Sequence, residues 1–209
     1  MEDDDGENRT RRRGPRRPEG APAGPDEVRR AVLDAAAALF TTRGVGAVSL
    51  RDIATEANIQ VALIRRYIGT REELIDAVMA DLSNQVVTGV TERPLEQQSF
   101  DPDSFVGRWT RLLVYFAITG RDLSTVADVN PARALAQVAA DAYGLDDEAA
   151  RVRGAQILAS ALGWRLLEPY LLKAGGLEDI PIQDLHDALT ELHRTIGAMS
   201  WERPSTPPS

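Results

Sequence analysis

Arginines gather in one short stretch of a chain that is acidic as a whole. From position 50 to position 71 the basic residues are Arg51, Arg65, Arg66 and Arg71. Only Asp52 and Glu56 oppose them, so four positive and two negative charges leave this stretch at +2, whereas the whole chain stands at −8. Guanidinium groups bind phosphate and can read guanine in the major groove of duplex DNA. This stretch is the candidate for binding nucleic acid; the alternative is an ordinary solvated surface.

The residues between these arginines are spaced as two short crossing helices. The positions that would face inward are Ile53, Ala57, Ile59, Ile64 and Tyr67. Ala54 is small where the helices would cross, and Asn58 stands at the turn, where a left-handed backbone conformation is needed. The outward positions of the second helix are Val61, Ala62, Leu63, Arg65 and Arg66. This pattern predicts a helix-turn-helix whose second helix docks in a major groove.

Capping residues mark where these helices begin. Ser49 and Asp52, which stands at the third helical position, can form a reciprocal capping box, and this predicts the start of the first short helix. Thr70 with Glu73 makes a second capping box and opens a longer helix that is expected to run through Leu82. The helix-turn-helix is therefore expected to lie between two well-defined caps.

Residues 26 to 75 resemble the DNA-binding domain of the TetR (tetracycline-repressor) family. The motifs that carry this resemblance are Phe40 and Gly44, Ser49 with Ile53-Ala54, Asn58-Ile59, Arg65-Arg66-Tyr67-Ile68, and Thr70-Arg71-Glu72-Glu73-Leu74. The rest of the chain is similar to the family only in its helical architecture. The chain departs from the family at four positions. Asn58 stands where the family has Gly, Gln60 where it has a capping Ser, Arg65 where it has a phosphate-contacting Tyr, and Ile68 where it has Phe.

The resemblance implies which residues contact DNA. They are Ser49, Arg51, Gln60, Val61, Ala62, Leu63, Arg65, Arg66, Tyr67, Thr70 and Arg71. Val61, Ala62 and Leu63 would face bases, and Arg51 would reach a base edge or a phosphate. Arg65, Tyr67 and Arg71 would hold phosphates, aided by the free amides of the helix that Thr70 opens. Arg66 is the outward residue best suited to read a guanine.

The expected fold class is all-α, with an N-terminal three-helix helix-turn-helix domain and a C-terminal helical dimerisation and ligand-binding domain. A composition rich in Ala and Leu, with 5% aromatic residues, favours helices. The expected divisions are a disordered Arg-rich arm over 1–25, a DNA-binding domain over 26–82, a dimerisation and effector-binding domain over 83–200 and a disordered tail over 201–209. The basic cluster from Arg9 to Arg17 either lies along DNA or is a soluble tail, and both readings stay open.

Two apolar seams at the coiled-coil period favour a homodimer. One consists of Val152, Ala155, Ala159, Leu162 and Leu166, and the other of Ile182, Leu185, Leu189, Leu192 and Ile196. The resemblance implies that the last two helices form a four-helix bundle with their copies in a second subunit. A palindromic operator in double-stranded DNA would need two motifs held at a fixed distance. The alternative is that both seams pack inside one subunit.

The rear helices also offer residues for a small apolar effector. The candidates are Phe105, Trp109, Phe116, Trp164, Arg165, Glu168 and Tyr170. The aromatic side chains could line a cavity and the two charged ones orient a ligand. Aromatic residues on buried helices are more often ordinary core, and Arg165 and Glu168 could simply pair near the surface.

The residue inventory excludes several kinds of site. The absence of cysteine excludes disulfides, cysteine-ligated zinc and thiol nucleophiles, and it fits a reducing cytoplasm. Without a long apolar run or a secretory N-terminus, no membrane partner is expected and the location is expected to be cytoplasmic. His186 and His193 are expected to be partly exposed helix residues, with no catalytic group, metal or cofactor around them. The alternatives to an effector-responsive regulator are an architectural DNA-binding protein and a helical enzyme.

Overall fold

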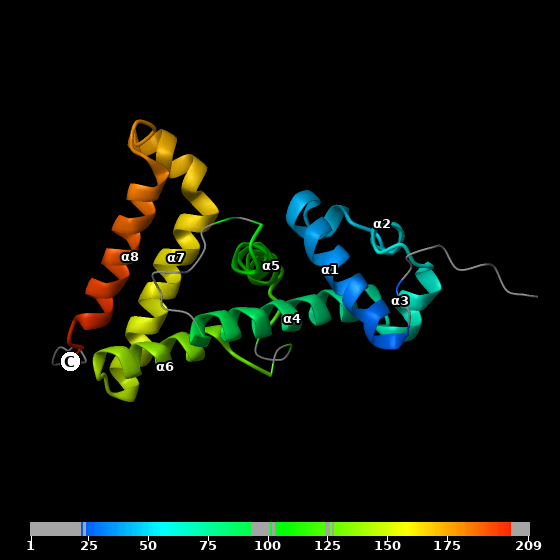
Figure 1. The fold of residues 1–209 in the computed structure, drawn as a ribbon, viewed down its shortest axis with the longest axis horizontal. Helices are drawn as coiled ribbons and strands as arrows, with labels where there is room; N and C mark the ends of the chain where they lie inside the picture. Colours follow the sequence, from blue (N-terminus) through cyan, green and yellow to red (C-terminus); the bar gives the residue numbers. More distant parts are fainter. Residues whose placement is uncertain are drawn as a thin grey trace, which may run out of the picture.

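The computed structural model describes residues 22, 24–92, 101, 103–123, 126 and 128–201. Across these residues the chain forms eight α-helices, one 3₁₀-helix and no strand, which confirms the all-α fold class (Figure 1). The elements are α1 (Pro25–Arg43), η1 (Val45–Ala47), α2 (Leu50–Glu56), α3 (Val61–Tyr67), α4 (Arg71–Glu92), α5 (Phe105–Thr119), α6 (Pro131–Tyr143), α7 (Asp147–Gly175) and α8 (Ile182–Ala198). Nearly all of the expected arm, including its Arg9 to Arg17 cluster, and nearly all of the expected C-terminal tail lie outside the described residues.

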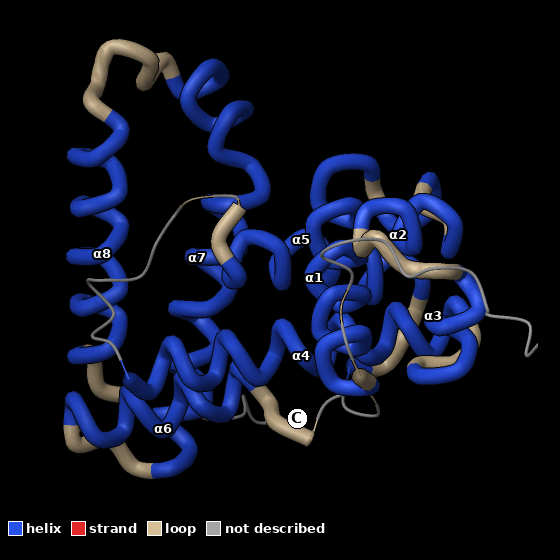
Figure 2. The backbone as a smooth tube through the Cα atoms, turned by 45° about the vertical axis from the view of Figure 1, so that its right-hand side comes forward, coloured by secondary structure: helices blue, strands red, loops and turns tan. Residues whose placement is uncertain are grey.

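The molecule is elongated, with α1 to α3 at one end and α7 and α8 at the other (Figure 1). Helix α4 links the two ends. It has 22 residues and continues to Glu92, beyond the Leu82 to which the sequence pattern was traced. The long helices α7 and α8 form an antiparallel hairpin (Figure 2). The boundary expected at position 82 therefore falls inside one continuous helix.

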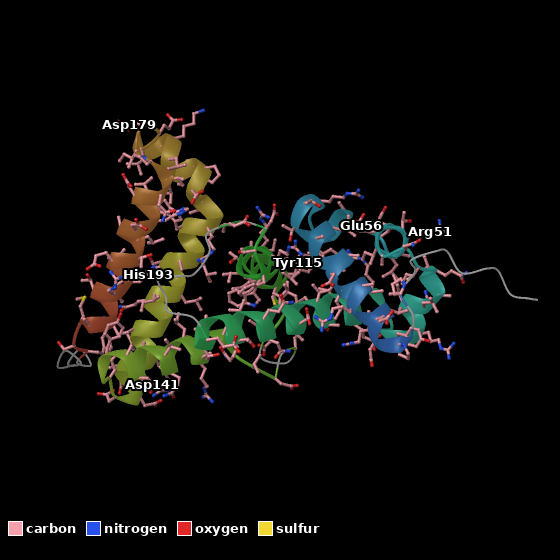
Figure 3. The ribbon with its side chains drawn as sticks, viewed as in Figure 1. Arg51, Glu56, Tyr115, Asp141, Asp179 and His193 are labelled. Atoms are coloured by element: carbon pink, nitrogen blue, oxygen red, sulfur yellow. The ribbon has the colours of Figure 1, made fainter. Side chains whose placement is uncertain are left out.

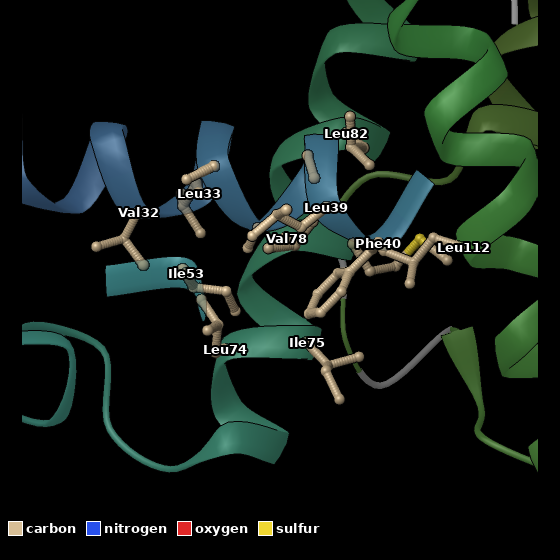
Figure 4. Packing of buried hydrophobic residues seen from close by; sticks show 14 of the residues in the cluster. Val32, Leu33, Leu39, Phe40, Ile53, Leu74, Ile75, Val78, Leu82 and Leu112 are labelled. Atoms are coloured by element: carbon tan, nitrogen blue, oxygen red, sulfur yellow. The ribbon is translucent and has the colours of Figure 1, made fainter. Parts of the chain in front are cut away.

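One hydrophobic cluster extends from α1 to α5. It joins Phe40 of α1, Ile53 of α2, Val78 of α4 and Leu112 of α5 (Figure 4). Trp109 and Phe116 of α5 belong to the same cluster. Because packed interiors transmit displacement, a shift of α5 must be felt by the helices around α2 and α3.

Helices α6 and α7 begin at residues whose side chains cap the first turn. The Asn130 side chain caps α6 by accepting from the amides of Ala132 and Arg133 at 3.0 and 3.2 Å, with Pro131 in the first turn. Asp146 caps α7 by accepting from Ala149 at 2.8 Å.

Helices α6 and α7 approach each other closely at Gly154. A Cβ atom there would lie 2.9 Å from Cα and 3.0 Å from the backbone N of Ala136. We expect Gly154→Ala to lower the free energy of unfolding by about 1–3 kcal/mol, because backbone cannot yield as a flexible side chain can. Urea unfolding at fixed protein concentration measures this change.

Gly163, on the same helix, is the matched control. A Cβ atom at Gly163 meets nothing within 4 Å. Within one subunit, Gly163→Ala should therefore raise the free energy of unfolding by about 0.5–1 kcal/mol through helix propensity, and sedimentation at the same concentration checks that the variant keeps the mass of the parent protein. Equal stabilities of the two variants would contradict the close contact at Gly154.

Candidate nucleic-acid interface

Helices α2 and α3 are joined by a tight turn at Asn58. Asn58 has φ of 51°, and no other non-glycine residue in the described ranges has a positive φ. The Ile59 amide closes the turn by donating to the carbonyl of Ala54 at 2.9 Å. Ile53, Ala54 and Ile64 are buried, and Ile64 is 0% exposed. The helix-turn-helix geometry expected from the sequence is confirmed.

The outer face of α3 carries Ala62, Arg65 and Arg66, all exposed. Each residue turns a helix by about 100°, so positions 62 and 66 point away from the buried Ile64. The Arg66 guanidinium carbon lies 5.4 Å from the centre of the Tyr67 ring. Arg51 on α2 is also exposed, at the end of the molecule opposite His193 of α8 (Figure 3).

Two residues expected to face outward do so only in part. Val61 and Leu63 are half-buried and pack against the core cluster. Val61 lies three positions before Ile64, within about 60° of it around the helix, so it shares the inward face. A helix of seven residues that must bury Ile64 leaves fewer outward positions than the sequence pattern suggested.

Ser49 and Asp52 form the expected capping box at the start of α2. The Asp52 carboxylate accepts from the Ser49 amide at 2.8 Å, and Ser49 Oγ accepts from the Asp52 amide at 3.3 Å. Hydrogen bonds from the Ser49 side chain and then its amide hold the pKa of Asp52 below its usual value. The Gln60 side chain makes no capping bond to α3, which matches its departure from the family's serine.

The start of α4 differs from what a phosphate site requires. The capping box is present, since the Glu73 carboxylate accepts from the Thr70 amide at 2.7 Å and Thr70 Oγ1 accepts from the Glu73 amide at 3.2 Å. The bond from the Thr70 amide is the main reason that the pKa of Glu73 is lowered. Glu72 and Glu73 thus place negative charge at the end that was expected to attract phosphate.

Arg71 has another partner than DNA. Its Nη2 donates to the backbone carbonyls of Val45 and Val48, in the connection between α1 and α2. These carbonyls lie in and just after a short 3₁₀ turn, where the Val45 carbonyl also accepts from the Val48 amide at 3.5 Å. The expectation that Arg71 holds a phosphate is therefore not supported; this side chain fixes the approach to α2.

Comparison with known proteins identifies this arrangement. The family profile described as "Bacterial regulatory proteins, tetR family" matches residues 32–78. An HTH-type transcriptional repressor of Mycobacterium tuberculosis and an HTH-type transcriptional regulator of Mycobacterium bovis are each 30% identical to the chain over 167 residues, covering 78% of this chain and 86% of theirs. The chain belongs to the TetR family.

The TetR fold extends over the rear helices too. A crystal structure of a TetR transcriptional regulator from Legionella pneumophila superposes with a TM-score of 0.51 at 18% identity, covering 83% of this chain and 97% of that one. As a TetR-family member the protein is a DNA-binding transcriptional regulator, not an enzyme, that acts as a dimer and binds small-molecule effectors. Along the described residues, no helix combines the length and apolar character that crossing a membrane requires.

The TetR-family hairpin of α7 and α8 carries an open apolar groove of about 500 Å³ on its surface. Residues lining it include Ala159, Trp164, Leu167, Leu185, Leu189 and Leu192. Of the two expected seams, Ala155, Ala159, Leu166, Ile182 and Leu192 are exposed, while Val152, Leu185 and Ile196 are half-buried.

The seam residues do not all lie on one exposed face. Leu162 packs against the core cluster, and Leu189 is buried although it also lines the groove. The seam on α7 is also rotated from the expected register, because Gly163 and Leu167 line the groove where Leu162 and Leu166 were expected. A coiled-coil period identifies an apolar stripe without telling which helix covers it.

The residues expected to bind an effector are not one cluster. Trp109 and Arg165 line an interior cavity, and Arg165 and Glu168 line a neighbouring cleft. Phe116 is instead buried in the core cluster, and Phe105 packs against Gly89. Tyr170 is 68% exposed, so its expected role in a cavity is wrong.

Trp164 faces the surface groove of the hairpin rather than the cavity. Its Nε1 donates to Glu168 at 2.7 Å, and His186 Nε2 lies 2.8 Å from the same carboxylate oxygen. The aromatic residues therefore divide between core, surface and cavity, which their spacing along the helices did not reveal.

Three residues of functional interest had no local sequence signal. Ser83 is buried and its Oγ accepts from Trp109 Nε1 at 3.1 Å. His193, expected to be partly exposed, is buried and lines the cavity. Arg121 follows α5 and pairs with Glu72 and Asp76 of α4. Each depends on contacts with distant segments, so no motif could identify it.

Proposed function

We propose that the protein is a homodimeric repressor that binds a palindromic DNA operator and is released from it by a small apolar effector. The observation that carries this proposal is the exposed pair Arg65 and Arg66 on α3, held in place by the buried Ile64. Residues 26–82 would bind DNA and residues 83–200 would dimerise and take the effector. A regulator of this kind would act in the cytoplasm, where it meets its operator.

The contacts with DNA would divide between bases and backbone. Arg66 and Ala62 point outward from α3, so they would meet base edges, with Arg66 reading a guanine. Arg65 and Arg51 would hold phosphates, and Tyr67 would support Arg66 through its ring. Smaller polar contacts at the helix starts would come from Ser49, Gln60 and Thr70. Apolar contacts at the edge of the outer face of α3 would come from Val61 and Leu63.

The effector signal would reach α3 through the ionic contacts that Arg121, which follows α5, makes with α4. Arg121 pairs with Glu72 and Asp76, and its guanidinium carbon lies 5.0 Å from the ring centre of Phe116. Glu72 Oε1 in turn lies 3.5 Å from Nη1 of Arg71, which holds the carbonyls before α2. An effector that shifts α5 and α4 would thereby change the separation of the two recognition helices.

Selection of bound DNA from a random pool with the purified protein tests the main proposal. Recovery of a two-fold symmetric site would support it, since the site reports motif, symmetry and spacing together. Recovery of no preferred sequence would contradict it. The release mechanism has its own test, because equal effector affinities of free and DNA-bound dimers would exclude the coupling.

Arg65→Ala tests the phosphate contact. We expect it to weaken binding by a similar factor on all sequences and to reduce the slope of log affinity against log salt by about 1. Fluorescence anisotropy with labelled operator at several salt concentrations measures both quantities. Arg151→Ala, an exposed change at the far end of the molecule, should alter neither. An unchanged slope in Arg65→Ala would remove the phosphate assignment.

A further inference from the structure

A small cavity lies among the rear helices, with walls from α4 to α8. Its apolar walls include Val86, Trp109, Leu135, Ile157 and Leu158, and its volume is about 60 Å³. Arg165, Thr190 and His193 also line it, so three groups able to hydrogen-bond enter an otherwise apolar space. Arg165 carries the sole formal charge among the lining residues at neutral pH.

Arg165 also borders a second, more polar cleft of about 160 Å³. Arg111 and Glu168 line that cleft with it, so two cations face one carboxylate. Oε2 of that carboxylate is already bound by Trp164 and lies 2.8 Å from His186. The side chain of Arg165 therefore stands where an apolar space meets a space of net positive charge.

Burial makes the charge of Arg165 costly to hold, whatever groups surround it. Desolvation lowers the pKa of Arg165 to about 10, although the charge of Glu168 opposes this shift. The group still carries its proton at pH 7, so the site presents a permanent cation to whatever enters. A carboxylate can bind a guanidinium group through two parallel hydrogen bonds and offset part of this cost.

His193 supplies a second polar group that could bind an oxygen of the same carboxylate. It is 7% exposed, and its Nε2 has no hydrogen-bond partner among the described residues. Burial first, and then the nearby charge of Arg165, lower the pKa of His193, so the ring is neutral at pH 7. A neutral imidazole can donate one hydrogen bond to an acceptor beside Arg165.

We propose that the effector is a small amphipathic acid, whose single carboxylate binds the guanidinium of Arg165 and whose apolar tail lies against Trp109 and Ile157. This inference rests on the proposed effector-responsive function and adds the chemical class of the effector. The cavity admits a short tail, and a longer one requires the lining side chains to move. Movement of Trp109 would displace α5 and with it Arg121, which follows α5 and pairs with Asp76 of α4.

Three probes of equal length and different head groups test the proposal: hexanoate, hexanamide and hexylamine. Isothermal titration calorimetry with the full-length protein at pH 7 measures their affinities. We expect hexanoate to bind at least about tenfold more tightly than either of the others. Equal affinities, preference for the amine, or no measurable binding of hexanoate would each overturn the proposal.

Variants assign the effect to Arg165. Arg165→Gln should reduce the affinity for hexanoate to that for hexanamide and leave hexanamide binding unchanged, whereas the control Arg151→Gln on the same helix should change neither. If Arg165→Gln does not fold, Arg165→Lys keeps the charge and should retain a reduced preference for the acid. A preference for hexanoate that survives Arg165→Gln in folded protein would overturn the assignment.

DNA binding separates this inference from the proposed function. If hexanoate binds through Arg165 yet leaves operator affinity unchanged, the effector-release proposal fails and the ligand class stands. If only a neutral compound binds and weakens DNA binding, the ligand class fails and effector release stands.

Discussion

Leu192→Arg is expected to convert the dimer into monomers and to weaken operator binding at least about a hundredfold. Leu192 is 47% exposed and lines the apolar groove of the α7–α8 hairpin, which we propose as the dimer interface. A buried guanidinium without a partner strongly opposes association. A monomer binds only one half-site. In a dimer the second motif is held near the second half-site at a high effective concentration, and the monomer lacks this contribution to affinity.

Analytical ultracentrifugation measures the change in mass, and anisotropy measures the change in operator affinity. Ile118→Arg is the matched control, because Ile118 is 77% exposed at the end of α5, outside the hairpin. Both substitutions are on the surface of one subunit, so neither should change the stability of the subunit itself by more than about 0.5 kcal/mol. A Leu192→Arg protein that remains dimeric would place the interface elsewhere.

Ile64→Ala is expected to lower the free energy of unfolding by about 2–5 kcal/mol. Ile64 is 0% exposed and is the one residue of α3 that is fully buried, so its loss leaves a cavity beneath the recognition helix. The change is a large part of the roughly 5–15 kcal/mol that stabilises a typical domain. Operator affinity should fall as well, because Arg65 and Arg66 depend on α3 for their positions.

Urea unfolding followed by circular dichroism measures the loss of stability. Ile118→Ala removes the same atoms from an exposed position and should change the free energy of unfolding by less than about 0.5 kcal/mol. Equal stability of Ile64→Ala and the control would mean that α3 does not pack as the structure shows.

The DNA-binding end was predictable because its signals are local. The Ser49 and Thr70 capping boxes, the left-handed Asn58 and the burial of Ile53 and Ile64 all follow from residues within a few positions of one another. Contacts at such short separations depend on backbone geometry, which the residue types largely determine.

The partner of Arg71 could not be predicted from nearby residues. The motif assigned this residue to a phosphate, but its guanidinium reaches carbonyls that lie 23 and 26 residues earlier in the chain. A long, flexible cation takes whichever acceptors the fold brings near it. The sequence gives its charge, and the tertiary structure selects its partner.

The amino-acid sequence by itself determined the all-α class, the helix-turn-helix and the family, because helical period, caps and turn residues act over short distances. Only the tertiary structure decided that Tyr170 lies in solvent, that Leu162 packs inward and that Arg165 meets His193 at one cavity. An apolar stripe lowers its free energy against any apolar neighbour. Which neighbour it finds depends on how all the helices pack together, and that is a property of the whole chain.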